Sequence, residues 1–291
     1  MNIIIFGATG RLGTALCRHL TGHNLKLPAT EDFASADGPE LVRMIRESGA
    51  EMAVNTAAYN NVNGAEGDGY ETCRRANAEF PGLLADAAAT VGIPLIHFST
   101  NYVFSGEKGS PYVESDVPDP VSRYGQAKAD GERLVRENHP EGSFVIRTSR
   151  LFGPPGTAPE SKRSFVEIIV GELSEQAASP DPKPVLVDDR EVCSPTFIDD
   201  LAEAVTRHFI GAQQPVGIYH LTNSGSCTWF GWAEEIARLS GLGVPVAPRP
   251  LSEIKPRPAR VPPYSVLEST RLPALRPWPE ALRDYMSKYG K

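Results

Sequence analysis

The sequence predicts an α/β fold, in which a doubly wound parallel sheet is joined to a smaller C-terminal domain. Short apolar runs alternate with longer helical stretches in the first half of the chain, and this alternation is typical of βαβ units. A glycine-rich turn follows the first apolar run directly. After Gly153 the alternation stops and prolines become frequent, so we expect the first domain to end near residue 150.

The expected strands of the sheet are short and apolar, as strands buried on both faces are. They lie at Ile3–Phe6, Met52–Asn55, Leu95–Ser99 and Phe144–Thr148. The intervening stretches have helical length and periodicity, and we expect helices at Leu12–Leu20, Pro39–Ser48, Tyr70–Val91 and Tyr124–Asn138.

The second half of the chain is less regular, and the stretch Val244–Pro263 is dense in proline. Its expected elements are strands at Val185–Val187 and Ile218–His220 and helices at Ile198–Ile210, Trp229–Leu239 and Pro279–Tyr285. We expect residues 1–150 and 184–210 to form the larger domain. Residues 151–183 and 211–291 then form the smaller one.

Composition excludes several classes of function. The net charge of −7 argues against nucleic acid or an anionic membrane as the main partner, because both favour basic surfaces. The four cysteines are far apart and the six histidines are scattered, so we expect free thiols and no metal site. The N-terminus resembles no signal peptide and no apolar run reaches membrane-spanning length. We therefore expect a cytoplasmic protein, either a monomer or a homodimer.

The glycine turn has the spacing GxxGxxG and lies between a strand and a helix. Close approach of a pyrophosphate to the backbone requires glycine, and the free amides at a helix N-terminus bind its charge. We expect this segment to bind NADPH or NADH through Gly7, Thr9, Gly10, Arg11, Leu12 and Gly13. The larger domain is then a Rossmann-type NAD(P)-binding domain.

The choice between the two cofactors stays open. An acidic side chain about 20 residues beyond the glycines would favour the ribose of NAD, and Glu31 and Asp32 lie near that point. Arg11 could instead contact the 2′-phosphate of NADP, or it could be a solvated arginine on the first helical turn.

Tyr124 and Lys128 are four residues apart at the start of an expected helix, so they share one face of it. A neighbouring ammonium group favours the phenolate, so we expect Lys128 to lower the pKa of Tyr124 and make it a proton donor for ketone reduction. Ser99 and Thr100 end an expected strand on the side where parallel sheets bind ligands. Thr100 is placed to donate a hydrogen bond to the substrate carbonyl.

This ordered set of motifs resembles the extended short-chain dehydrogenase/reductase superfamily, and more narrowly the dTDP-4-dehydrorhamnose reductase family. The segments that carry the resemblance are Gly7–Gly13, Asn55–Tyr59, Val62–Glu66, Ser99–Phe104, Tyr124–Glu132, Ser194–Phe197, Gly217–Leu221 and Tyr264–Leu267. It implies reduction of a 4-keto-6-deoxy sugar carried on a nucleoside diphosphate. It also implies a catalytic set of Thr100, Tyr124 and Lys128. Cofactor contacts then include Ala57, Ala58, Tyr59, Asn77, Ser99, Tyr124 and Lys128, and substrate contacts include Asn101, Val103 and Arg150.

The chain departs from the family pattern where the sugar would bind. Asn63 and Asn101 stand where the family usually has aspartate, and Arg150 stands where it usually has tryptophan. Arg150 would bring a fixed positive charge suited to a more anionic or differently substituted ligand. It could equally be an exposed arginine turned away from the pocket.

Two other functions remain open at this point. One branch of the fold serves as a regulatory subunit of methionine adenosyltransferase, and such a protein would bind NAD(P) without catalysis. A sugar-nucleotide epimerase would hold its cofactor tightly. The intact set of Thr100, Tyr124 and Lys128 favours a reductase.

Overall fold

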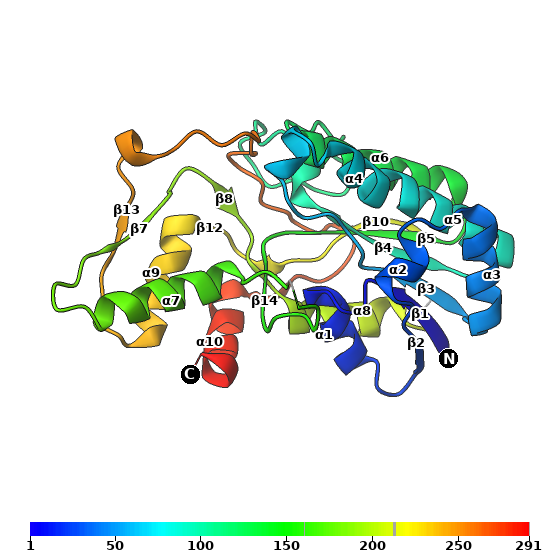
Figure 1. Cartoon of the computed structure of the whole chain (residues 1–291), viewed down its shortest axis with the longest axis horizontal. Coiled ribbons are helices and arrows are strands. Elements are labelled where there is room, and N and C mark those ends of the chain that lie inside the picture. The colour runs from blue at the N-terminus through cyan, green and yellow to red at the C-terminus, as the bar shows by residue number, and fades with distance from the viewer. Residues whose placement is uncertain (160, 212–213, 291) are drawn as a thin grey trace.

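The computed structural model describes residues 1–159, 161–211 and 214–290. Its larger part is an open sheet of six parallel strands, in the order β10-β5-β4-β3-β1-β2 (Figure 1). These strands are β1 (Asn2–Phe6), β2 (Asn24–Lys26), β3 (Met52–Asn55), β4 (Leu95–Thr100), β5 (Ser143–Thr148) and β10 (Gly217–His220). The chain turns back between β2 and β3, so the point where strand order reverses lies beside β1. Ligands of such sheets bind at the carboxyl ends of the strands near this point.

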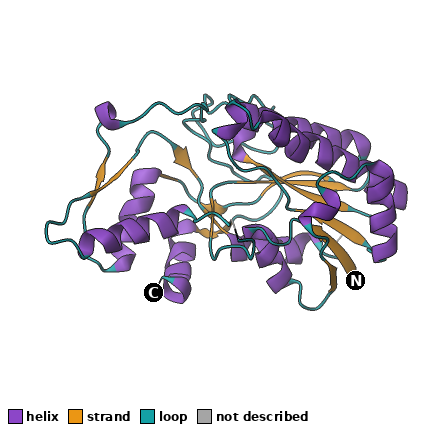
Figure 2. Ribbon diagram, in the orientation of Figure 1, coloured by secondary structure: helices purple, strands orange, loops and turns teal. Residues whose placement is uncertain are grey.

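Helices cover both faces of the sheet, as Figure 2 shows. One face packs against α3 (Gly38–Ser48) and α5 (Phe80–Val91), with α6 (Arg123–Asn138) beside α5. The other packs against α1 (Arg11–His19) and α8 (Ile198–Phe209). Alternate residues of β1 enter different cores, Ile3 and Ile5 on the α1 side and Ile4 and Phe6 on the α3 side. The doubly wound fold predicted from the sequence is confirmed.

A smaller lobe holds three helices that pack on one another, α7 (Phe165–Ala177), α9 (Trp229–Ser240) and α10 (Trp278–Tyr289). Its strands form short pairs. They are β7 (Val185–Val187) with β13 (Val246–Pro248), β8 (Val192–Cys193) with β12 (Cys227–Thr228), β6 (Leu151–Phe152) with β9 (Thr196–Phe197), and β11 (Asn223–Ser224) with β14 (Leu275–Pro277). No helix among residues 1–159, 161–211 and 214–290 is long and apolar enough to cross a membrane.

Two strands belong to the other domain than the one to which we assigned them from the sequence. The strand at residues 185–187 was assigned to the larger domain, but it pairs with β13 in the smaller lobe. The strand at residues 217–220 was assigned to the smaller domain, but it extends the main sheet beside β5. A strand belongs to the domain that contains its pairing partner. A strand of three or four residues is too short for its sequence pattern to identify that partner.

Most predicted helices are present with ends shifted by a residue or two, and α10 runs four residues past its predicted end. The predicted helix Tyr70–Val91 is interrupted by a π-helical turn at Arg75–Glu79, between α4 (Tyr70–Arg74) and α5. Pro81 has no N–H to donate to the carbonyl of Asn77, which explains why the regular bonding shifts there. Helix α7 was not predicted, because its β-branched residues obscure the helical period.

Candidate active site

A cleft of about 800 Å³ lies between the carboxyl ends of the strands and the smaller lobe. Both parts of the molecule line it. The residues that it brings together include Gly10, Arg11, Leu12, Ala58, Tyr59, Ser99, Thr100, Asn101, Tyr124, Lys128 and Arg150, all of them singled out from the sequence. Phe165 and Trp229 of the smaller lobe complete the wall.

The glycine turn forms a tight floor to this cleft. Gly7 has φ of +80°, and a Cβ there would lie 2.5 Å from the amide nitrogen of Ala57. A Cβ on Gly13 would lie 2.3 Å from the carbonyl oxygen of Gly7. Helix α1 begins directly after Gly10 and no side chain caps its first amides, although the backbone of Gly156 lies close to the amide of Arg11. The turn therefore fits a dinucleotide pyrophosphate.

Neither sequence interpretation of Arg11 describes its place in the structure. Its guanidinium forms an ion pair with Glu167 of α7 at 3.0 Å and donates to the carbonyls of Gly153 and Lys162. It thus joins the glycine turn to the smaller lobe instead of standing solvated or free for a phosphate. Glu31 and Asp32 are exposed in the short helix α2 (Thr30–Phe33), where Asp32 accepts a bond from the Ala29 amide.

Asn77 and Ala57 support the cleft from below and are not among its lining residues. The Asn77 side chain accepts from the Tyr59 amide and donates to the Tyr59 carbonyl, both at 3.0 Å. Asn55 accepts from the Ala57 amide at 3.0 Å, and its Nδ2 lies 3.1 Å from Nδ1 of His97. These buried amides fix the conformation of the loop after β3, and the Thr56 hydroxyl holds it against the glycine turn by contacts with the carbonyls of Phe6 and Gly7 at 2.9 Å.

Tyr124 and Lys128 project from the first turns of α6, which Ser122 caps by accepting from the Gly125 amide. The Lys128 ammonium donates to the carbonyl of Phe98 at 2.6 Å. Burial lowers the pKa of Lys128 to about 8, with the charge of Glu132 acting in the opposite direction. Burial also raises the pKa of Tyr124, while contact with the Thr100 hydroxyl and the charge of Arg150 oppose the rise. The expected lowering of the Tyr124 pKa by Lys128 is therefore wrong for the protein alone, because desolvation outweighs nearby charge.

Thr100 is oriented by its neighbours. Its hydroxyl donates to Oδ1 of Asn101 at 3.1 Å and accepts from the amide of Tyr102 at 3.2 Å. Nδ2 of Asn101 in turn donates to the Ser265 hydroxyl at 2.7 Å. Asn101 therefore links Thr100 to the C-terminal part of the chain. Val103 lies outside the cleft, because its side chain is buried against Phe104, Tyr112 and Leu267.

Several buried polar atoms at the ends of β4 and β5 have no partner within the described residues. They are the hydroxyls of Ser99, Thr148 and Ser149 and the Nε of Arg150. All four residues line the cleft. Buried polar groups in native proteins are normally hydrogen-bonded, so unpaired ones in a cleft indicate a place for a polar ligand. Together with the glycine floor, they fit a nicotinamide dinucleotide and its substrate.

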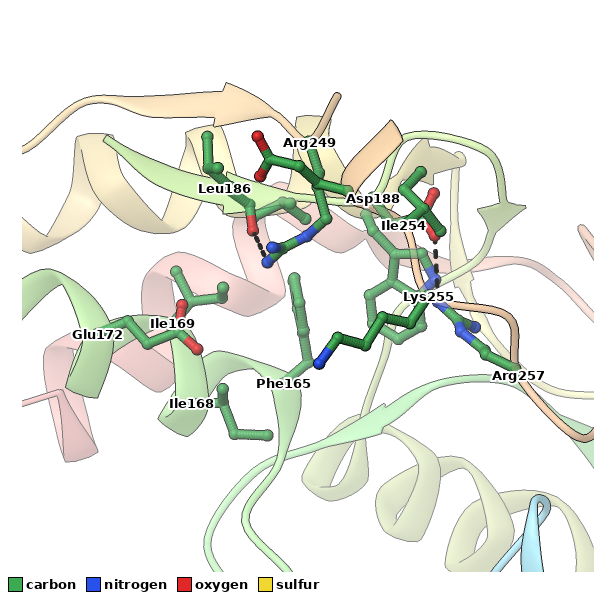
Figure 3. A pocket seen from close by; sticks show the side chains of 13 residues that line it. Phe165, Ile168, Ile169, Glu172, Leu186, Asp188, Arg249, Ile254, Lys255 and Arg257 are labelled. Carbon is green, nitrogen blue, oxygen red and sulfur yellow. Dashed lines mark hydrogen bonds and ion pairs between the residues drawn. The ribbon is translucent and has the colours of Figure 1, made fainter. Parts of the chain in front are cut away.

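A second cavity of about 470 Å³ adjoins the cleft through Phe165 and Trp229 (Figure 3). The residues around it come from α7, from β7 and from the segment after β13. Its cations are Arg249, Lys255 and Arg257. Sequence reasoning missed this cavity, although the aromatic run Trp229–Trp232 at a helix start was a usable signal for a binding surface.

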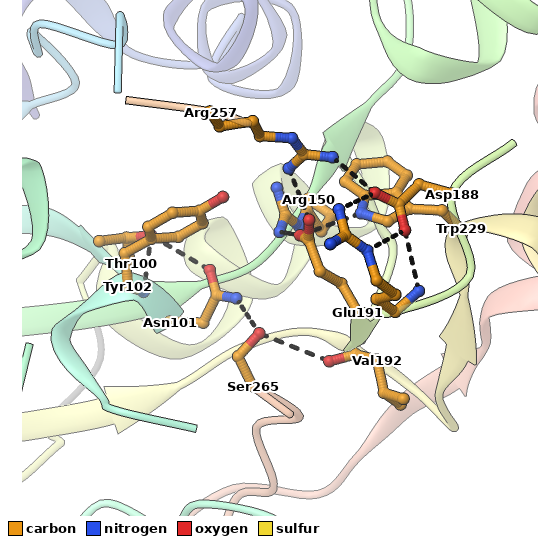
Figure 4. A network of polar contacts seen from close by, with 11 residues as sticks. Thr100, Asn101, Tyr102, Arg150, Asp188, Glu191, Val192, Trp229, Arg257 and Ser265 are labelled. Atoms are coloured by element: carbon orange, nitrogen blue, oxygen red, sulfur yellow. Dashed lines mark hydrogen bonds and ion pairs between the residues drawn. The ribbon is translucent and has the colours of Figure 1, made fainter. Parts of the chain in front are cut away.

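Arg150 lines the cleft, so the interpretation of this residue as an exposed arginine turned away from the pocket is wrong. It is also not a free charge, because its guanidinium pairs with Glu191 at 2.7 Å (Figure 4). Nothing in the sequence pattern pointed to Glu191, which lies 41 residues further along the chain.

The chain matches the family described as RmlD substrate binding domain over residues 1–290. It belongs to this family. A spore coat polysaccharide biosynthesis protein, SpsK of Bacillus subtilis, is 32% identical over 98% of this chain and 97% of its own. A dTDP-4-dehydrorhamnose reductase of Streptomyces griseus is 34% identical over 97% and 91%. A probable dTDP-4,6-dihydroxy-2-methyloxan-3-one 4-ketoreductase of Streptomyces antibioticus is 36% identical over 98% and 94%.

Solved structures of the family have the same fold. A dTDP-4-dehydrorhamnose reductase of Clostridium acetobutylicum superposes with a TM-score of 0.88 at 30% identity, over the full length of both chains. A dTDP-4-dehydrorhamnose reductase of Bacillus anthracis, solved in complex with NADP, gives a TM-score of 0.88 at 26% identity over 99% of both chains. The resemblance inferred from the sequence is confirmed.

Proposed function

We propose that this protein is an NAD(P)H-dependent reductase of a nucleoside-diphosphate-linked 4-keto-6-deoxy sugar. The observation that carries the proposal is that Thr100, Tyr124 and Lys128 line one cleft together with the start of α1. A protein that only bound the cofactor would have no need of this set. Relatives of the same family are named as reductases of such sugars.

The proposed roles follow from chemistry at the keto oxygen. A bound reduced nicotinamide would supply the hydride. The hydroxyl of Tyr124 donates a hydrogen bond to the keto oxygen, and so does the hydroxyl of Thr100, which would give up its bond to Asn101 when substrate binds. The oxygen then takes the Tyr124 proton as the carbonyl carbon becomes a secondary alcohol. Because burial raises its pKa, Tyr124 holds that proton at neutral pH until the alkoxide forms. The Lys128 ammonium stabilises the resulting phenolate.

The second cavity is the place that we propose for the nucleotide portion of the substrate. Phe165 and Trp229 offer aromatic faces to a base, and Arg249 and Lys255 offer charge to the diphosphate. Arg257 is already paired with Glu191 and Asp188. The sugar would then extend past Trp229 toward Tyr124.

The test is oxidation of NADPH and NADH by the purified protein with a panel of dTDP- and UDP-linked 4-keto-6-deoxy sugars. We expect turnover with at least one member and none without a keto sugar. If no member is reduced, the two alternatives are examined directly. Nicotinamide absorbance in the protein as purified would indicate an epimerase, and a stable complex with methionine adenosyltransferase would indicate a regulatory subunit.

Cofactor binding should weaken as pH rises through about 8. Lys128 has a lowered pKa of about 8, so its positive charge is present below that pH and is lost above it. An anionic cofactor binds the charged form better. We expect the Kd of NADPH to rise above this pH and the Lys128→Met variant to show no such break. An unchanged break in the variant would assign it to another group.

A further inference from the structure

The pair formed by Arg150 and Glu191 is held on every side. The Arg150 guanidinium lies over the ring of Tyr102 at 5.0 Å and over the ring of Trp229 at 4.5 Å. Glu191 accepts from Arg150 at 2.7 Å and from Nε1 of Trp229 at 3.1 Å. The pair is therefore a rigid unit in the cleft wall.

The backbone of Arg150 points to the same conclusion. Its φ of +45° makes it the one residue other than glycine that has a positive φ in the described ranges. Such a conformation is costly for a residue with a side chain and persists only where the surroundings enforce it. The contacts with Tyr102, Trp229 and Glu191 are what enforce it here.

The two buried charges of the Arg150–Glu191 pair balance each other. The side chains of Glu191 and Arg150 are only 4% and 14% exposed, and their charges cancel each other. Arg257 also donates to Glu191, at 2.6 Å, but it is 37% exposed and partly screened by solvent. Asp188 and Arg190 pair with each other further out, at 2.6 Å. Asp188 also pairs with Arg257, at 3.3 Å, so this group of three arginines and two carboxylates keeps one positive charge. That charge lies on the more exposed Arg190 and Arg257, whereas the buried Arg150 beside Tyr124 is matched by Glu191.

We infer that Glu191 is a specificity-determining residue, which holds Arg150 as a neutralised hydrogen-bond donor and so selects an uncharged sugar over one that carries a carboxylate. This inference rests on the proposed function and names its substrate class. A sugar carboxylate facing Arg150 would approach the buried charge of Glu191, and like charges at such positions are strongly unfavourable. The guanidinium of Arg150, whose side chain is 14% exposed, remains a hydrogen-bond donor for a neutral hydroxyl or keto oxygen. This preference is the opposite of the one expected from Arg150 alone, which suggested a more anionic ligand.

The test compares Kd values of dTDP-glucose and dTDP-glucuronate, measured by calorimetry on the NADPH-saturated protein. Neither compound carries a ketone, so binding is read without turnover. We expect the wild type to prefer dTDP-glucose. In Glu191→Gln the charge of Arg150 is no longer balanced, and the ratio of the two Kd values should move toward dTDP-glucuronate by about tenfold or more.

Two further variants separate charge from structure. Glu191→Asp keeps the carboxylate and should retain the wild-type preference. Glu235→Gln removes a carboxylate that pairs with Arg238 on α9 and lines neither cavity, and it should leave the ratio unchanged. An unchanged ratio in Glu191→Gln, with both compounds bound, overturns the inference alone. If neither compound binds the wild type, the same comparison is made with UDP-glucose and UDP-glucuronate, and failure of all four to bind contradicts the proposed function as well.

Discussion

Replacing Tyr124 by phenylalanine should lower kcat by about 10²–10⁴-fold while leaving the fold and cofactor binding intact. The hydroxyl is the only part removed, and it is the proposed source of the proton for the keto oxygen. The ring still packs edge-to-face on Tyr102, with centroids 5.6 Å apart. Steady-state rates and the Kd of NADPH on the same preparation measure the two effects.

Tyr102→Phe is the matched control for this experiment. Tyr102 lines the same cleft and also loses only a hydroxyl, but it does not follow the YxxxK spacing. We expect its loss of kcat to stay below about tenfold, which is small beside a general acid–base contribution. If the two variants lost activity equally, or if Tyr124→Phe kept the full rate, Tyr124 would not be the proton donor.

Glu132→Ala should lower the free energy of unfolding by about 3–5 kcal/mol, since it leaves a buried guanidinium unpaired. Arg147 of β5 is fully buried and donates to both oxygens of Glu132, at 2.7–3.1 Å. Glu132 lies one turn beyond Lys128 on the same face of α6, so this ion pair anchors the helix that carries the proposed catalytic groups. Urea unfolding measures the change, provided that the slope of the unfolding free energy against urea concentration is the same in both proteins.

The same helix offers a control for this prediction. Glu137 pairs with Arg133 at 2.6 Å, but both side chains are 55% exposed. We expect Glu137→Ala to cost at most about 1 kcal/mol, because exposed ion pairs contribute little. The double variant Glu132→Leu with Arg147→Met should recover much of the loss by removing both charges. A loss below about 1 kcal/mol in Glu132→Ala would mean that Arg147 finds another partner.

The sequence was most informative where a short stretch of chain contains the whole signal. The glycine turn and the Tyr124–Lys128 pair depend on spacing along one strand, one turn or one helix, and local geometry determines which way such residues face. The order of these motifs was therefore enough to predict the sheet, the family and a cleft at the carboxyl ends of the strands.

Only the tertiary structure decided how charges and short strands are paired. Arg11 meets Glu167 and Arg150 meets Glu191 across 156 and 41 residues of chain, so no local pattern could reveal either partner. The raised pKa of Tyr124 likewise follows from burial, which packing of distant segments creates. Sequence alone thus identified many of the groups that line the cleft, but not Phe165 and Trp229, and it wrongly placed Val103 there. The charges and protonation of the cleft groups depend on desolvation and long-range pairing, which exist only once the chain has folded.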